Sequence, residues 1–181
     1  MNDENQLILA HLVADWSARD PERDVLTFVT VEADGSLAGT VRSYGGLWRE
    51  GQRLAQGLVE ESMAPGQSFA IVMQNHPEFV DAMVASSIAN TVFVPIDPRI
   101  RGAKLAYMLG FAECRGALVA DYALAQLTEV LDELDGLDWL WVLDTGMGAE
   151  LPAAVRARWL TQVQADAAGP DLAIRASDPG Q

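Results

Sequence analysis

The sequence has few of the residues from which disulfides and metal sites are built. Of its 181 residues one is a cysteine, Cys114, and two are histidines. A single cysteine forms no internal disulfide and supplies too few ligands for a cysteine-based metal site, and such a count fits a reducing compartment. We therefore expect no metal site and a cytoplasmic location.

Several catalytic motifs are absent as well. No G-x-G-x-x-G follows an expected strand, and the only lysine, Lys104, is followed by Leu105, so no G-x-x-x-x-G-K-[ST] loop exists. No serine lies in G-x-S-x-G and no H-E-x-x-H is present, which disfavours a Ser-His-Asp hydrolase and a zinc protease. We therefore assign no catalytic residue within these 181 residues.

Positive charge is scarce, with 12 Lys and Arg against 26 Asp and Glu, for a net charge of −14. Nucleic-acid binding needs a basic face that neutralises phosphates, and an anionic membrane surface is disfavoured for the same reason. The N-terminus MNDENQ is acidic and polar, unlike a secretory signal, and no apolar run approaches the roughly 20 residues of a bilayer span. We expect neither a nucleic-acid nor a membrane partner.

Apolar residues make up half of the chain, which is typical of a globular protein and sufficient for one domain or a large part of one. Apolar spacing predicts a helix over 7–18, and β-branched runs at 25–31 and 37–41, joined through Asp34-Gly35, predict an antiparallel ribbon. Ser43 is placed to cap a following helix that ends before Pro65-Gly66.

From residue 69 onward apolar strands and amphipathic helices alternate. We expect strands at 69–73, 91–95, 116–120 and 139–143, helices at 75–89, around 105–112 and at 124–134, and a helical 151–164. Strands spaced by helices of this length imply right-handed βαβ units. The predicted fold class is α/β: a parallel sheet flanked by helices, with an N-terminal antiparallel ribbon.

The segment 73–79 is the most informative local pattern. Asn75 is expected to cap the following helix, with Pro77 in its first turn and Glu78 completing a capping box. This pattern needs no ligand, yet a helix N-terminus at the carboxyl end of a parallel strand is also where α/β sheets bind anions. Capping is the simpler interpretation of the two.

Three cations follow a strand end in a chain otherwise short of them: Arg99, Arg101 and Lys104. Arginine grips phosphate through a fork of donors and lysine adds a point charge. The alternative is a solvated helix start whose cations pair with the abundant carboxylates. From the pattern alone the second interpretation is favoured.

Two other clusters favour structural roles. Glu129, Asp132 and Glu133 are expected to form one solvated helix face, opposite an apolar stripe, and not a pair of catalytic carboxylates. Trp139 and Trp141 share one face of their strand, which is typical of a core.

The order of these pieces resembles the amino-terminal region of adenylate-forming enzymes, the AMP-binding acyl- and aryl-CoA synthetases, luciferases and peptide-synthetase adenylation domains. The resemblance covers about residues 20–180 and rests on motifs in the family's order: Ser43-Tyr44, Leu54-Ala55-x-Gly57-Leu58, Ala64-Pro65-Gly66, Asn75-His76-Pro77-Glu78-Phe79, Val92-Phe93-Val94-Pro95-Ile96-Asp97-Pro98-Arg99 and Leu105-Ala106-Tyr107-Met108-Leu109. One departure is Asn90-Thr91, where the family usually has Gly-Ala. Asparagine tolerates the left-handed backbone that glycine offers, so the fold need not change.

The resemblance implies an ATP-dependent acyl-CoA synthetase, with a place in pathways such as fatty acid metabolism. A carboxylic acid and ATP would give an acyl-adenylate, and CoA would then displace AMP; ATP, Mg²⁺ and CoA are the implied cofactors. The family's S-G-T-T-G-x-P-K-G loop would begin a few residues after 177–181. Residues 1–181 are thus expected to be the N-terminal lobe, truncated before the phosphate-binding loop, inactive and without tight cofactor binding on their own.

Within this lobe the resemblance points to Arg99 as a contact of the CoA phosphates, with Arg101 and Lys104 as weaker candidates. The expected partners are a small carboxylic acid, CoA and the remaining lobes of the same enzyme. The acyl group, the choice between CoA and a carrier-protein thiol, and homo-oligomer formation remain open.

Two alternatives belong to other classes. A free-standing α/β binding module without chemistry is the main one, and it should end in a packed element, whereas a truncated lobe should leave apolar surface exposed. An acidic flavodoxin-like or receiver domain is disfavoured because Met73-Gln74-Asn75, and not an acidic pair, ends the first buried strand.

Overall fold

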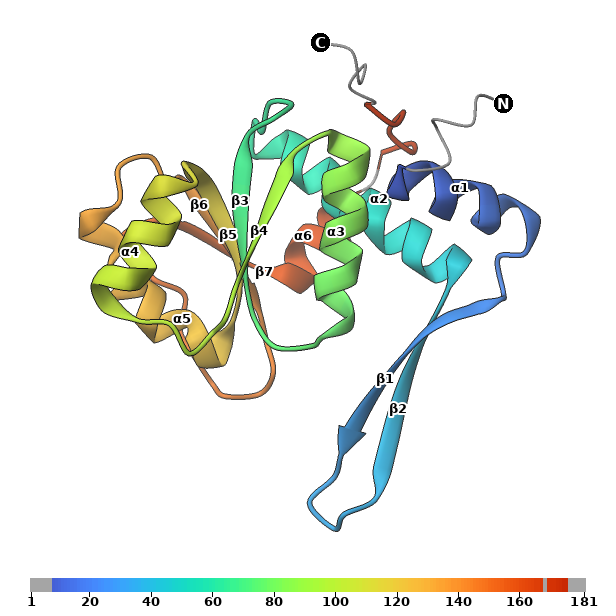
Figure 1. The fold of residues 1–181 in the computed structure, drawn as a ribbon, viewed down its shortest axis with the longest axis horizontal. Coiled ribbons are helices and arrows are strands. Elements are labelled where there is room, and N and C mark those ends of the chain that lie inside the picture. The colour runs from blue at the N-terminus through green and yellow to red at the C-terminus, as the bar shows by residue number, and fades with distance from the viewer. Residues whose placement is uncertain (1–7, 168, 176–181) are drawn as a thin grey trace.

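A five-stranded parallel sheet forms the centre of the molecule (Figure 1). The computed structural model describes residues 8–167 and 169–175. In chain order the strands are β3 (Ser68–Val72), β4 (Val92–Ile96), β5 (Cys114–Ala120), β6 (Trp139–Leu143) and β7 (Arg156–Trp159). Their spatial order is β4-β3-β5-β6-β7, and every neighbouring pair is parallel. The second strand of this sheet along the chain, β4, therefore lies on one side of β3, and the third, β5, lies on the other.

Helices cover both faces of this sheet. One layer consists of α1 (Leu9–Arg19), α2 (Tyr44–Glu60), α3 (Pro77–Ala89) and α6 (Leu160–Asp166), and the other of α4 (Gly102–Phe111) and α5 (Asp121–Thr128). Side chains alternate across each strand, so Phe69 and Ile71 enter the first core and Ala70 and Val72 the second. The predicted α/β class is confirmed.

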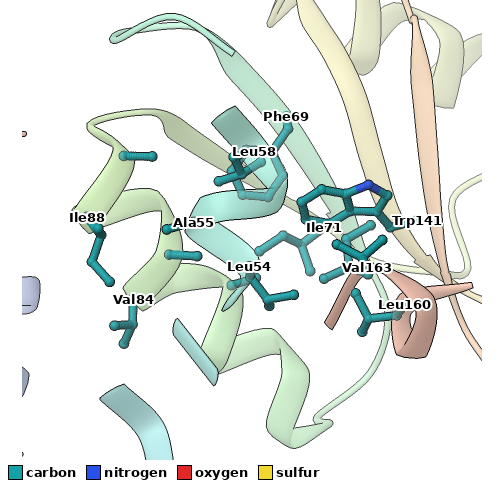
Figure 2. Close-up of a cluster of buried hydrophobic side chains, with 14 of the residues drawn as sticks. Leu54, Ala55, Leu58, Phe69, Ile71, Val84, Ile88, Trp141, Leu160 and Val163 are labelled. Atoms are coloured by element: carbon teal, nitrogen blue, oxygen red, sulfur yellow. The ribbon is translucent and has the colours of Figure 1, made fainter. Parts of the chain in front are cut away.

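Figure 2 shows the first of these cores, where α2, α3 and α6 meet the sheet. Leu54 and Leu58 of α2 lie between Ile71 of the sheet and Val84 of α3. Trp139 and Trp141 are both buried here, with ring centroids 4.6 Å apart. The expectation that the tryptophan pair belongs to the core is confirmed.

The antiparallel ribbon is a hairpin that projects away from the body formed by the sheet and its helices (Figure 1). Its strands are β1 (Asp24–Val31) and β2 (Leu37–Ser43). Gly35 in the turn has a φ of +83°, a conformation open to glycine, which confirms the Asp-Gly turn. Ser43 ends β2 and caps α2, accepting a hydrogen bond from Gly46 N at 3.2 Å, as predicted.

The expected helix over 124–134 is wrong at both ends. α5 begins at Asp121 and ends at Thr128, and only a short 3₁₀ helix, η2 (Leu131–Glu133), follows. The Thr128 hydroxyl donates to Ala125 O at 2.8 Å, and Val130 N bonds Leu127 O, three residues back. Such bonds compete with the regular helical ladder. Glu129, Asp132 and Glu133 are therefore not one face of a helix.

The expected helix over 151–164 is also wrong in its first half, because 156–159 form the edge strand β7. The register pairs Trp139 with Arg156 and Val142 with Trp159. The arginines between apolar neighbours find carboxylates on either side, Arg156 at Glu61 and Arg158 at Asp166. Pairing with β6 thus overrides a local sequence pattern that favours a helix. The helix α6 begins only at Leu160.

Candidate functional site

A cleft of about 1290 Å³ lies at the carboxyl ends of β3, β4 and β6. Segments 73–79, 95–99 and 143–145 line it from the body, and residues 27–31 of β1 line it from the hairpin. In doubly wound sheets ligands bind at the carboxyl edge where the chain reverses its direction of winding. That reversal occurs here at β3, so the fold itself places this cleft at the edge where ligands bind.

The β3–α3 loop at the base of the cleft is built differently from the sequence prediction. His76, not Asn75, is the N-cap of α3, and no side chain donates or accepts a capping hydrogen bond there. The predicted capping box between Asn75 and Glu78 is therefore wrong, whereas Pro77 does occupy the first turn as expected. The His76 side chain is directed toward Tyr122 and does not cap the helix.

Tyr122 connects the ends of β3 and β5 across the point where the chain reverses. Its hydroxyl oxygen accepts from Gln74 N at 2.6 Å and lies 3.1 Å from His76 Nε2. Burial is the main cause that raises the pKa of Tyr122. Sequence reasoning missed this residue because its contacts join segments 46 to 48 residues apart.

Asp121, at the carboxyl end of β5, holds the loop that follows β6. Its carboxylate accepts from Thr145 N at 2.9 Å, from Met147 N at 3.0 Å and from Tyr122 N at 2.8 Å. Burial alone would raise the pKa of Asp121, but these bonds and one from the Thr145 hydroxyl lower it below the ordinary value. Asp121 is thus a charged anchor of the 144–147 loop.

A buried ion pair fastens the hairpin to the body beside the cleft. Asp81 of α3 is fully buried, and its oxygens accept from Arg42 of β2 at 3.1 and 3.4 Å. Glu78 also lies near Arg42, at 3.6 Å. Burial outweighs the arginine and raises the pKa of Asp81 to about 6.

Of the three predicted cations, only Arg99 lines the cleft. Its Nε and Nη2 donate to Asp97, with Nε 2.9 and 3.1 Å from the two carboxylate oxygens, while its side chain stays 85% exposed. Hydrogen bonds from Arg99 lower the pKa of Asp97 to about 2. Asp97 therefore pairs with an exposed guanidinium at the edge of the cleft.

Arg101 and Lys104 lie at the start of α4, outside the cleft lining. Arg101 is the N-cap residue and Lys104 lies in the first turn, and both are exposed. With the Gln126 amide oriented to donate to Pro98 O, its oxygen accepts from Arg101 Nη2 at 3.3 Å. The structure thus separates these two cations from Arg99, whose assignment to a phosphate stays a prediction.

Metal-ligand clusters and membrane-spanning helices are absent from the part of the chain that the structure describes. Within 8–167 and 169–175, no three His, Cys, Asp or Glu residues are grouped so that they could hold a metal ion. No helix in the same part of the chain has the length and apolar character needed to cross a membrane.

Comparison with known proteins places the chain in a family. The sequence profile described as "AMP-binding enzyme" matches residues 13–174. A feruloyl-CoA synthase of Amycolatopsis sp. is 37% identical over 62 residues, 34% of this chain and 13% of that protein. A dimodular nonribosomal peptide synthase of Bacillus subtilis is 28% identical over 89 residues, 49% of this chain and 4% of that protein.

The fold is also found in solved structures. A crystal structure described as a long-chain-fatty-acid CoA ligase of Rhodopseudomonas palustris aligns with a TM-score of 0.70 at 19% identity. The match covers 92% of this chain and 37% of that one. The chain therefore spans about a third of the length of this structural neighbour, and a smaller share of the curated relatives it matches.

Proposed function

The chain belongs to the AMP-binding enzyme family, and from this premise we propose that it is the N-terminal lobe of an ATP-dependent acyl-CoA synthetase. The parent enzyme would convert a carboxylic acid and ATP to an acyl-adenylate and pyrophosphate. The thiol of CoA would then displace AMP. The match of the family profile over residues 13–174 is the observation that carries this proposal.

The cleft at the carboxyl edge of the sheet supports the same function. Its volume of about 1290 Å³ is large enough to admit a nucleotide, and it opens where the winding of the sheet reverses. The role of residues 8–175 would be to form this wall, with Tyr122 and Asp121 holding the loops that shape it. Positioning of this kind lowers the barrier of acyl and phosphoryl transfer.

Arg99 fits a phosphate of CoA because its guanidinium is exposed at the edge of the cleft, where it pairs with Asp97. Arg101 and Lys104 would add positive potential from the start of α4, without lining the cleft. Mg²⁺ would be expected to accompany ATP. The loop that binds the ATP phosphates would follow residue 181 in the parent, so the 181-residue chain should be inactive and bind neither ATP nor CoA tightly.

A carrier-protein thiol is the second candidate acceptor, favoured by the peptide synthases among the relatives. Both candidates share the acid-activation step and differ only in the thiol that displaces AMP. Adding free CoA or a phosphopantetheinylated carrier protein to the activated acid separates them by which thioester forms.

The experiment that tests the proposal is ATP–pyrophosphate exchange with a panel of carboxylic acids. The full-length product of the gene is assayed beside the 181-residue chain, after its intact mass has been compared with 19.5 kDa. Exchange that depends on one class of acid and occurs only with the longer product supports the proposal. Exchange by the 181-residue chain, or a gene product of 19.5 kDa, contradicts it.

A further inference from the structure

Most of the ionisable side chains that line the cleft already have a partner. Within the described structure these pairs are Glu78 with Arg42, Asp97 with Arg99, and Asp144 with the backbone N–H of Gly146. His76 also lines the cleft, but its ring has a bond at one nitrogen, between Nε2 and the Tyr122 hydroxyl. The other ring nitrogen, Nδ1, has no hydrogen-bond partner in the described part of the chain. His76 therefore retains a ring nitrogen for a ligand.

Tyr122 decides which of the two ring nitrogens carries the hydrogen. Its hydroxyl oxygen accepts from Gln74 N at 2.6 Å, and His76 Nε2, at 3.1 Å, is the acceptor within reach of the hydroxyl hydrogen. When the hydroxyl donates to Nε2, a neutral imidazole carries its own hydrogen on Nδ1. The bond network thus assigns the Nδ1–H tautomer, and His76 brings an N–H donor to the cleft.

The sheet places this donor beside Arg99. β3 and β4 are neighbours whose last residues, Val72 and Ile96, are paired in register. His76 follows the first of these strand ends and Arg99 the second, and both line the same cleft. β4 is an edge strand of the sheet, so a ligand held at Arg99 passes the end of β3 on its way to the middle of the cleft. His76 therefore meets the part of that ligand that follows the phosphate.

Resting on the proposed function, we propose that His76 donates a hydrogen bond from Nδ1 to the pantetheine arm of the thiol acceptor, and that Tyr122 is the positioning residue that orients it. CoA and a carrier protein share this arm, and its amide carbonyls are neutral hydrogen-bond acceptors. Only CoA adds the nucleotide phosphates that we assign to Arg99. A neutral imidazole donor suits a carbonyl oxygen, whereas the forked guanidinium suits a phosphate.

Thioester formation by the full-length enzyme, with CoA and with pantetheine as acceptors, tests the contact. His76→Ala should raise the KM about 3-fold or more for both thiols, because a neutral hydrogen bond is lost from the part that they share. Arg99→Ala should raise the KM for CoA and not for pantetheine, which lacks phosphates. His11→Ala is the matched control, since the other histidine lies in α1, outside the cleft lining.

Two results would overturn the assignment of His76 to the arm. One is a KM for pantetheine that is the same in His76→Ala and in His11→Ala. The other is a KM for ATP or for the acid, measured by ATP–pyrophosphate exchange, that rises as much as the KM for the thiols. That second result would mean that His76 shapes the cleft as a whole.

The role of Tyr122 is tested by removing its hydroxyl alone. Tyr122→Phe should raise the KM for both thiols about 2-fold or more, because His76 loses the bond that orients it. In the His76→Ala background the same change should have less than about a 1.5-fold effect, since residues that act through one contact are not additive. Equal effects of Tyr122→Phe in the two backgrounds contradict a role through His76.

The tautomer gives a readout that needs no activity. The chain has two histidines, so NMR of the imidazole nitrogens in the 181-residue chain, at a pH where both rings are neutral, gives few signals. His76→Ala identifies the signals of His76. The hydrogen should reside on Nδ1 in the wild type and shift toward Nε2 in Tyr122→Phe. A hydrogen on Nε2 in the wild type overturns the orientation by Tyr122.

Failure of this inference is distinguishable from failure of the proposed function. A longer enzyme that forms thioesters with a KM unaffected by His76→Ala contradicts only the inference. A longer protein without ATP–pyrophosphate exchange contradicts the function and, with it, the assignment to the arm. In that case the tautomer measurement still decides whether Tyr122 orients His76.

Discussion

Asp81 is a charged residue that the fold buries completely beside the candidate cleft. It is an acidic residue in the largely apolar helix α3. Its partner is Arg42, with Glu78 and Glu50 as further negative charges nearby. Its folded-state pKa of about 6 exceeds the ordinary value of 3.8. The folded chain therefore holds the proton more tightly than the unfolded chain does.

The first prediction follows from the sign of this shift. Stability contributed by Asp81 is fully present below pH about 4 and is lost as pH rises through about 6. The loss is roughly 3 kcal/mol at 1.36 kcal/mol per pKa unit. Urea unfolding of the wild type and of Asp81→Asn between pH 4 and pH 7 isolates the contribution of Asp81, because the two proteins have all their other carboxylates in common. The unfolding free energy of the wild type should fall relative to the variant. A difference that stays constant with pH contradicts the raised pKa.

Arg99 carries the second prediction, which concerns the full-length enzyme. Arg99→Ala should raise the KM for CoA about 10-fold or more, because a charge-assisted bond to phosphate contributes roughly 1.5–3 kcal/mol. ATP–pyrophosphate exchange should stay within about 2-fold, since exchange precedes thiol binding. Arg19→Ala is the matched control: Arg19 is an exposed arginine paired with Asp15 at 2.7 Å, outside the cleft lining. Equal KM values for CoA in the two variants would contradict the assignment of Arg99 to the CoA site.

At the scale of elements, α2 packs closely against α6 and β6. A Cβ on Gly57 would lie 2.7 Å from Val163 Cγ1 and 2.9 Å from the Trp141 ring, whereas a Cβ on Gly110 of α4 would meet nothing within 4 Å. Both glycines lie in helices, so the gain in helix propensity on substitution by alanine is the same.

The third prediction compares these two glycines. Gly57→Ala should destabilise the chain by roughly 1–3 kcal/mol through overpacking against α6 and β6. Gly110→Ala should stabilise it by roughly 0.5–1 kcal/mol through helix propensity alone. Chemical denaturation of both variants measures the two signs. Stabilisation by Gly57→Ala would contradict the close packing of α2 against α6.

Element by element, the sequence predicts what depends on neighbours in the chain and fails where distant partners decide. The Asp34-Gly35 turn, the Ser43 cap and the apolar strands of the parallel sheet follow from local chemistry. β7 does not, because its arginines become compatible with a strand only when Glu61 and Asp166 face them. At the end of α5 the Thr128 hydroxyl donates to Ala125 O and Val130 N bonds Leu127 O, and the local apolar pattern does not predict this change of bonding.

The candidate site divides in the same way. Arg99 and the 73–79 segment are recognisable from the sequence because their residue types follow strand ends. Tyr122, Asp121 and the Arg42–Asp81 pair are not, since each acts across 24 or more residues of chain, and nothing in the local pattern distinguishes them from other polar residues. What the sequence predicts of the site is its place on the sheet edge, and not the bonds that shape it.

At the scale of the whole molecule, the charge distribution sets a global constraint on stability. Compaction of a chain with 26 acidic and 12 basic side chains brings like charges together, and this repulsion opposes folding. Several ion pairs counter it locally, but exposed pairs such as Arg19–Asp15 contribute little. The net long-range term is therefore destabilising, and salt should weaken it more than it weakens the buried Arg42–Asp81 pair.

The fourth prediction is that sodium chloride stabilises the fold. Raising the salt from about 10 mM to about 200 mM shortens the screening length from roughly 30 Å to below 10 Å, which removes most repulsion between distant carboxylates. The midpoint of thermal unfolding should rise by roughly 2–4 °C, equivalent to about 1 kcal/mol for a chain of this size. Sucrose at equal osmolality is the control for general exclusion effects. A midpoint that falls with salt would mean that attractive pairs outweigh the net charge of −14.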